Sequence, residues 1–153
     1  METLDRDEAL RILEAAPVAH LGMIDSGLPY VTPMSFVVSG EYVVFRTMAG
    51  RKLDAIRANP RVCVEASDFD PATGDWSSVI VTGAARLVDE EDMKTATVSA
   101  LLRKYESVMG SPLSSGGIRP LGDMPHFIAV EIEDVSGMTS GRGFSTRTRP
   151  GRL

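Results

Sequence analysis

The sequence predicts a mainly β fold with flanking helices, in which six antiparallel strands form a small β-barrel. Segments rich in β-branched and aromatic residues follow one another through short turns that contain glycine, at Asp25-Ser26-Gly27 and at Ser39-Gly40. Strands do not alternate with long helices, which argues against a doubly wound parallel sheet. A chain of this size protects its sheet edges either by closing a barrel or by pairing with a second subunit.

Length and composition predict one domain in residues 1–137 and a tail in residues 138–153 that is flexible or docks on a partner. The chain has 153 residues, of which 24% are charged and 43% hydrophobic, as in ordinary globular proteins. Its net charge of −5 argues against a general nucleic-acid binder. No apolar run approaches the roughly 20 residues that span a bilayer, and the acidic N-terminal segment does not resemble a signal peptide. We therefore expect a cytoplasmic protein without nucleic-acid or membrane partners.

In the first half of the chain, a helix comes before a meander of strands. Asp5 and Glu8 have the spacing of a capping box, and Pro17 closes the helix that they begin. Apolar runs separated by turns then predict strands, and a short helix that ends at Asn59-Pro60 separates the last of them from the others. The predicted strands are residues 18–24, 30–38, 41–47 and 61–67.

In the second half, two strands flank a long helix. Residues 76–88 form the fifth strand, and Gly83 inside it suggests a bulge or a bend. Asp89 and Asp92 begin a helix of roughly 20 residues, on which apolar side chains recur at i, i+3 and i+4. Residues 127–135 form the sixth strand by their alternation of apolar and polar side chains.

The segment 45–60 is the strongest candidate for a binding site. A strand ends at a turn that contains Gly50, and the following helix begins with two cations, Arg51 and Lys52. A helix N-terminus carries partial positive charge, so cations there are unfavourable on local grounds. Together with free backbone N–H groups and a glycine, they describe a site for an anion such as phosphate. Two solvated side chains on a surface turn remain the alternative.

Other chemical signatures are missing from the sequence. It has no G-x-S-x-G motif, and no nucleophile has the spacing of a catalytic pair with His20 or His126. Cys63 lies in a strand and is expected to be a small buried hydrophobic residue. Two isolated histidines and one cysteine do not make a zinc site. We therefore assign neither catalytic side chains nor metal ligands.

Four blocks of the sequence resemble a known family. They are G-L-P-Y-V-T-P-M-S-F, V-V-F-R-T-M-A-G-R-K-L, N-P-R-V and W-S-S-V-I-V-T-G-A-A-R-L-V, and they occur in this order within residues 27–88. They resemble the pyridoxamine 5′-phosphate oxidase-like, FMN-binding split-barrel superfamily, and within it most closely the nitroimidazole-resistance-type branch. The resemblance covers residues 5–137, and G-R-K-L followed by N-P-R-V is its most specific part.

The resemblance implies a split barrel that binds FMN at the interface of a homodimer. By position, the phosphate would be held by Arg51 and Lys52, and one strand would run along the edge of the isoalloxazine. The remaining cofactor-binding residues that the resemblance implies are Thr32, Pro33, Met34, Ser35, Arg46, Thr47, Ser77 and Ser78. Thr32 and Thr47 are also ordinary strand residues, and the two serines could simply cap a strand end.

The function implied is an FMN-dependent oxidoreductase of small molecules, such as a nitro- or quinone reductase. Hydride would arrive from NADH or NADPH and pass through flavin N5 to the acceptor, with no side-chain acid or base. The C-terminal Trp and Arg with which pyridoxamine phosphate oxidases hold their substrate have no match in residues 127–153, which argues against vitamin B6 oxidation. The alternatives are a deazaflavin-dependent reductase of the same fold and a non-catalytic module that binds flavin or haem.

Overall fold

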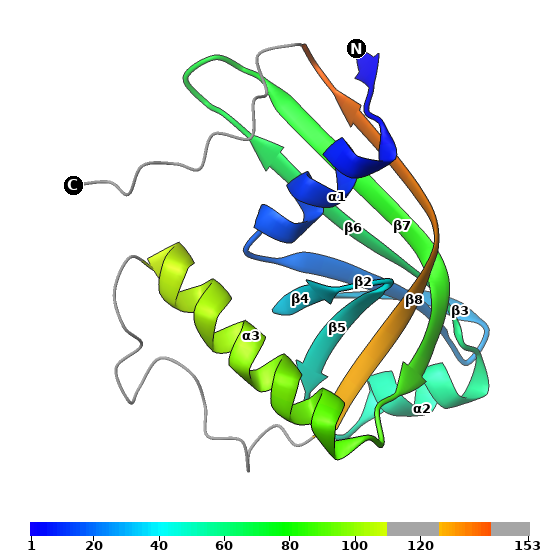
Figure 1. Cartoon of the computed structure of the whole chain (residues 1–153). Helices are drawn as coiled ribbons and strands as arrows, with labels where there is room; N and C mark the ends of the chain where they lie inside the picture. Colours follow the sequence, from blue (N-terminus) through cyan, green and yellow to red (C-terminus); the bar gives the residue numbers. More distant parts are fainter. Residues whose placement is uncertain (110–125, 142–153) are drawn as a thin grey trace.

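A computed structural model describes residues 1–109 and 126–141 of the chain (Figure 1). The helices are α1 (Arg6–Ala15), α2 (Arg51–Ala58) and α3 (Glu91–Met109). The strands are β1 (Glu2–Thr3), β2 (Ala19–Asp25), β3 (Leu28–Met34), β4 (Phe36–Ser39), β5 (Tyr42–Thr47), β6 (Arg61–Phe69), β7 (Trp76–Leu87) and β8 (His126–Thr139). The mainly β prediction is confirmed.

The strands form one antiparallel sheet in the order β3-β2-β6-β7-β8-β5-β4, with β1 paired to β8. The two terminal strands of this order, β3 and β4, do not pair with each other, so the barrel is split between them. Only Ser35 separates them in the chain. The sheet also shifts register between Thr82 and Gly83, which confirms the bulge expected at this glycine.

The described residues form eight strands, whereas the sequence predicted six. The short β1 is one addition. The other arises because the predicted strand 30–38 breaks at Ser35, where the chain leaves the edge beside β2 and joins β5. Tyr105 on α3 holds this break, because its hydroxyl accepts a hydrogen bond from the Phe36 N–H at 3.2 Å and donates one to the Pro17 carbonyl at 2.8 Å.

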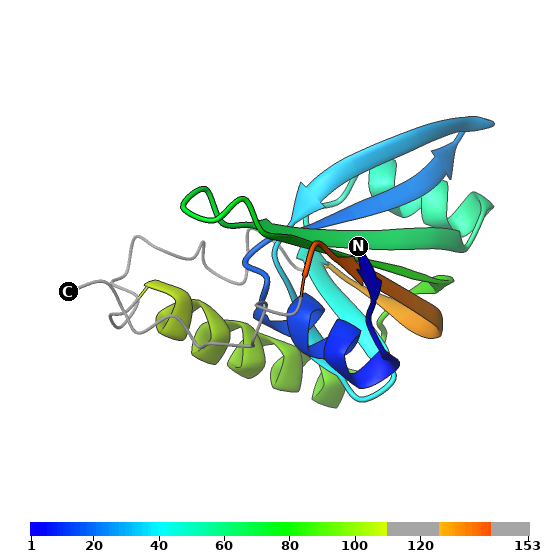
Figure 2. The ribbon, with the colours of Figure 1, turned by 90° about the horizontal axis from the view of Figure 1, so that it is seen from above.

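The strands enclose a hydrophobic core that α1 and α2 close. Strand alternation directs one face of each strand inward, and Phe36 and Phe45 meet at the centre with ring centroids 6.0 Å apart. α1 begins at Asp5, whose carboxylate accepts the Glu8 N–H while Glu8 accepts the Asp5 N–H, so the predicted capping box is confirmed. A second, smaller cluster packs α3 against β4, β5 and β8. Figure 2 shows α1 and α3 on one side and α2 beside the β2–β3 hairpin.

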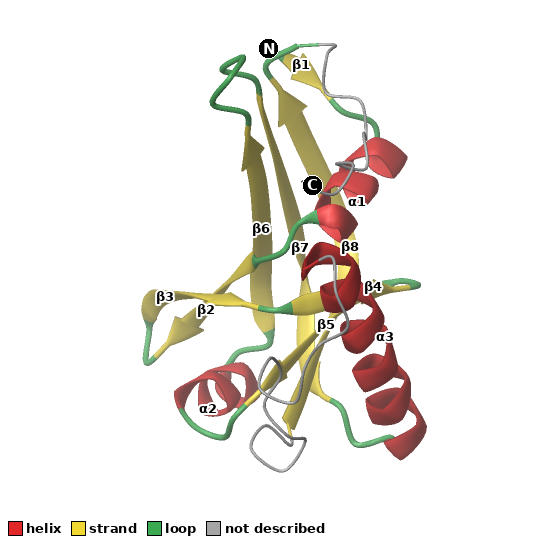
Figure 3. Cartoon of the chain, turned by 90° about the vertical axis from the view of Figure 1, so that its left-hand side faces the viewer, coloured by secondary structure: helices red, strands yellow, loops and turns green. Residues whose placement is uncertain are grey.

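The outer face of the sheet from β3 to β7, together with the second half of β8, is not covered by any described helix (Figure 3). Apolar side chains are exposed on it, among them Val31 at 62% and Ile80 at 45%. Cys63 also lies on this face, so the expectation that it is buried was wrong. Val62 and Val64 point into the core, and alternation directs the cysteine between them outward. Among the described residues, no helix has the length and apolar character needed to cross a bilayer.

Candidate functional site

The N-terminus of α2 is open to a ligand. Gly50 precedes the helix with φ 138°, a conformation that favours glycine, and no side chain of the described residues caps this end. A Cβ built at Gly50 would meet nothing within 4 Å. Residues 48–51 are exposed, so the partial positive charge of this helix end is accessible from the side of Gly50 among the described residues.

Arg51, the first residue of α2, reaches back to the tip of the β2–β3 hairpin. Its Nε donates to the Asp25 carboxylate, and its guanidinium lies over the Tyr30 ring, 4.2 Å from the ring centroid. The hydrogen bond to Asp25, more than the opposite charge itself, raises the pKa of Arg51 above its ordinary value. The side chain is nevertheless 62% exposed, so part of the guanidinium stays accessible.

Lys52 follows on the same turn and is half-buried. Within the part of the chain that the structure describes, its ammonium makes no hydrogen bond or ion pair. The two cations therefore differ: Arg51 is held by protein groups, whereas Lys52 can turn toward an incoming anion.

The end of β5 places the two other polar candidates on opposite faces. Strand alternation puts Thr47 on the side of Phe45 in the main core, where its hydroxyl donates to the Met48 carbonyl at 3.2 Å. Arg46 instead shares the side of Val44, which packs toward α3, and it is buried and partnered. One ligand on one face of β5 could thus meet only one of these side chains.

On β3 the candidates also divide by alternation. Thr32 is half-buried on the same side as Tyr30, and this side is the one on which the Arg51 guanidinium stacks. Met34 is buried in the core, so only its backbone can reach a ligand, while Pro33 is exposed on the outer face. Ser35 is exposed at the split of the barrel.

For binding a ligand, the position of β3 at the edge of the sheet matters more than its side chains. β3 pairs with β2 alone, so its second edge carries backbone groups without a sheet partner among the described strands. Pro29 and Pro33 fit this position, because a proline lacks the N–H that an inner strand would need. A planar ligand with hydrogen-bonding groups along one edge could pair with this strand.

Ser77 and Ser78 lie apart from the other candidates. β7 is three strand positions from β3, or about 14 Å along the sheet at roughly 4.8 Å per strand. Ser77 faces inward and is fully buried, and its hydroxyl has no hydrogen-bond partner among the described residues. Ser78 faces outward beside Ser67 and Met138. A single chain thus brings Thr32 toward Arg51 but leaves the two serines elsewhere on the sheet.

The sequence did not point to Asp25 and Tyr30 as site residues. The turn at Asp25-Ser26-Gly27 was visible, but the contact with Arg51 joins residues 26 positions apart. A carboxylate at a hairpin tip is common, so only the fold shows what it does.

Lys104 and Tyr105, which hold the split at Ser35, were also missed. The Lys104 ammonium lies 3.5 Å from the centroid of the Phe36 ring and donates to the Phe36 carbonyl at 3.1 Å. Burial lowers the pKa of Lys104 to about 8, against the opposing charge of Glu14. Burial likewise raises the pKa of Tyr105. These groups shape the backbone at the split.

The donor set at α2 fits an oxyanion such as a phosphate. It combines an oriented guanidinium with a helix N-terminus and an ammonium that no side chain in residues 1–109 and 126–141 engages. Asp25 already shows that the guanidinium binds an oxyanion from the side of Nε. Within residues 1–109 and 126–141, no group of three or more His, Cys, Asp and Glu side chains is arranged to hold a metal ion.

Comparison with known proteins identifies the family of this chain. The model of the family described as pyridoxamine 5′-phosphate oxidase matches residues 5–139. An uncharacterised protein of Rhizobium meliloti is 30% identical over an alignment of 152 positions, which covers 94% of this chain and 97% of the relative.

Solved structures agree with this match. A FAD-binding protein of Mesorhizobium loti is similar with a TM-score of 0.72 and 28% identity, over 92% of this chain and 98% of that one. A candidate 5-nitroimidazole antibiotic resistance protein of Bacteroides thetaiotaomicron shares the fold with a TM-score of 0.69 and 18% identity, over 90% and 87% of the two chains. The split barrel and the matched residues lead to one assignment: the chain belongs to the pyridoxamine 5′-phosphate oxidase family.

Proposed function

We propose that this protein is a flavin-dependent oxidoreductase of small molecules that binds FMN through Arg51 and Lys52. The observation that carries the proposal is the N-terminus of α2, where an oriented guanidinium lies beside an ammonium and a helix end that have no side-chain partner within the described residues. Membership in the family and the similarity to a FAD-binding protein support a flavin as the ligand. The phosphate dianion of FMN would accept hydrogen bonds from these donors.

In this proposal the protein binds and orients the cofactor. Arg51, Lys52 and the backbone of the first turn of α2 hold the phosphate, and Thr32 faces the same region from β3. The free edge of β3 and the exposed Ser35 offer backbone groups to the pyrimidine edge of the ring. The flavin, when bound, would supply the redox chemistry, so the proposal requires no acid–base pair of side chains.

The proposal includes a homodimer formed by the outer face of the sheet. Exposed apolar residues gather on this face, and no described helix covers it. In one chain Ser78 lies about 14 Å along the sheet from β3, at roughly 4.8 Å per strand. A second copy on this face could bring its own β7 to the edge of the first, and a twofold interface would repeat the site on both chains.

The test begins with the visible spectrum of the purified protein and titrations of the flavin-free chain with FMN, FAD and riboflavin. We expect a yellow protein that binds FMN more tightly than riboflavin. NADH or NADPH should bleach it, and a nitroaromatic or a quinone should restore the colour with turnover. A protein that binds none of these flavins would refute the proposal, and one that binds flavin but never exchanges electrons would be a storage or sensing module.

A further inference from the structure

The contact between Arg51 and Asp25 leaves the end of the guanidinium free. A guanidinium carries five N–H donors, one on Nε and two on each Nη. Asp25 engages Nε, and no other hydrogen bond of Arg51 is present within the described part of the chain. The pair of Nη groups, which binds phosphate in bidentate fashion, is therefore available on a side chain that is 62% exposed.

Two groups fix the orientation of this guanidinium. The Asp25 carboxylate holds it through a hydrogen bond, and the Tyr30 ring supports its face at 4.2 Å. The Asp25 side chain is only 18% exposed, so the anchor is itself held by its surroundings. An arginine held in this way gives up less conformational freedom when it binds an anion.

The hairpin places both groups by its register. Ser26 and Gly27 adopt φ 52° and 79°, as a tight two-residue hairpin turn requires, and Tyr30 pairs with Met23 across the strands. Asp25 lies two residues after Met23 and thus on the same side of the hairpin as Tyr30. α2 packs on β2, which brings Arg51 to this side.

We propose that Asp25 and Tyr30 are positioning residues that hold Arg51 with its Nη groups toward the flavin phosphate. The tip of the β2–β3 hairpin then sets how strongly the protein prefers a phosphorylated flavin over riboflavin. This inference rests on the proposed function. Because Asp25 occupies Nε rather than the Nη pair, it orients the guanidinium without competing with the phosphate for the same donors.

The experiment compares FMN with riboflavin, which has the same ring and ribityl chain but no phosphate. Flavin-free wild-type protein and the Asp25→Asn variant are titrated with each ligand. Asparagine suits a hairpin turn and keeps the shape of the side chain, so the fold should persist. We expect about a tenfold loss of FMN affinity, because the neutral amide holds the guanidinium without the ion pair that the carboxylate provides, and riboflavin affinity within about twofold of wild type.

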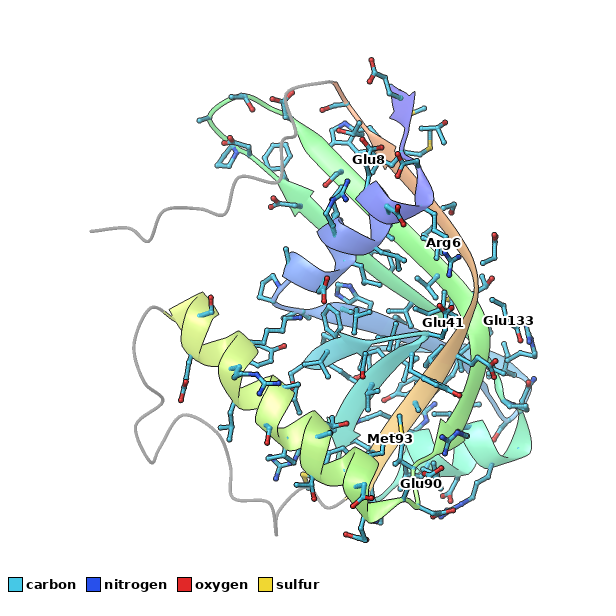
Figure 4. All side chains as sticks on the ribbon, in the orientation of Figure 1. Arg6, Glu8, Glu41, Glu90, Met93 and Glu133 are labelled. Atoms are coloured by element: carbon cyan, nitrogen blue, oxygen red, sulfur yellow. The ribbon has the colours of Figure 1, made fainter. Side chains whose placement is uncertain are left out.

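Three further variants serve as comparisons. Tyr30→Leu removes the ring and should weaken FMN binding by about three- to fivefold, whereas Tyr30→Phe keeps the ring and should bind like wild type. Glu41→Gln makes the same charge change as Asp25→Asn. It does so in the ion pair with Arg6 (Figure 4). Glu41 precedes β5, and at roughly 3.4 Å per residue it lies about 20 Å from Thr47, the end of β5 that leads to α2. It should leave both affinities unchanged.

The outcomes separate the inference from the proposed function. Equal or tighter FMN binding by Asp25→Asn would overturn the inference. Tighter binding would mean that Asp25 competes with the phosphate for Arg51, and equal binding would mean that Asp25 has no role in FMN binding. Parallel losses of FMN and riboflavin affinity would also overturn it, since they would show a purely structural role. If the wild-type protein itself does not prefer FMN to riboflavin, the phosphate site in the proposed function is refuted, independently of the role of Asp25.

Discussion

Arg51 and Lys52 show how far single residues can be interpreted from the sequence. Two cations at a helix N-terminus are locally unfavourable, and this conflict by itself marks the segment as a candidate anion site. The structure shows that Arg51 is held by a carboxylate and an aromatic ring, so its charge is partly compensated within the fold. Among the described residues, the ammonium of Lys52 has no such compensating partner.

We expect the double variant Arg51→Ala, Lys52→Ala to lose FMN binding while it keeps its fold. Each charge-assisted contact to a phosphate contributes about 1.5–3 kcal/mol, so the loss of both should weaken FMN binding a hundredfold or more. Riboflavin, which lacks the phosphate, should bind as it does to wild type. A fluorescence titration that gives unchanged FMN affinity would show that the phosphate binds elsewhere.

Lys104 should give the stability of the protein a recognisable pH dependence. In the unfolded chain its ammonium loses a proton near pH 10.5, whereas burial lowers this pKa to about 8 in the folded chain. Between these values the unfolded state holds more protons, so a rise in pH favours the folded state. The free energy of unfolding, measured by urea denaturation from pH 8 to 9.5, should rise in wild type relative to Lys104→Met.

The pH window for this comparison ends below 10, because Tyr105 on the same helix has a raised pKa and would begin to titrate in the unfolded chain. If wild type and Lys104→Met show the same pH slope, the ammonium is not buried as the structure describes.

At the scale of elements, local signals located most strands and both ends of the helices well. Asp5 and Glu8 identified the start of α1, and alternation identified β8. The break at Ser35 was not predicted, because β-branched and aromatic residues lie on both sides of it, at Tyr30–Thr32 and Phe36–Val38, and no glycine separates them. The break depends on α3, whose Tyr105 and Lys104 bind the backbone of Phe36 from 68 to 69 positions away.

The bulge at Gly83 offers a test of the barrel itself. A Cβ at this position would overlap the carbonyl oxygen of Glu131 on β8, and a backbone atom cannot move aside without a cost in free energy. We expect Gly83→Ala to lower the free energy of unfolding by about 2 kcal/mol or more. Gly141→Ala is the matched control, because a Cβ there meets nothing within 4 Å, and its change should stay within about 0.5 kcal/mol. Similar effects in thermal unfolding of the two variants would argue against the bulge.

For the whole molecule, the uncovered outer face is the feature that calls for a partner. If a second copy covers it, charges introduced there should separate the subunits, because a buried unpaired charge is strongly unfavourable. We expect Val31→Lys combined with Ile80→Lys to give a folded monomer in analytical ultracentrifugation and to weaken flavin binding.

The control for this prediction is Leu102→Lys, which changes an exposed apolar residue on α3, away from the outer face. It should keep the mass of wild type. If the wild-type protein sediments as a monomer, or if the double variant remains a dimer, the proposed homodimer through the outer face is refuted.

The mainly β class, the capping box, the bulge and the pair of cations after the third predicted strand all follow from the sequence, because each depends on neighbours in the chain. Which residues meet those cations follows only from the folded chain. The same holds for Thr32, which shares the side of Arg51, for Ser77 and Ser78, which lie three strands away, and for Cys63, which faces outward. Sheet order joins residues far apart in sequence, and the neighbours of a strand cannot be deduced from its own residues.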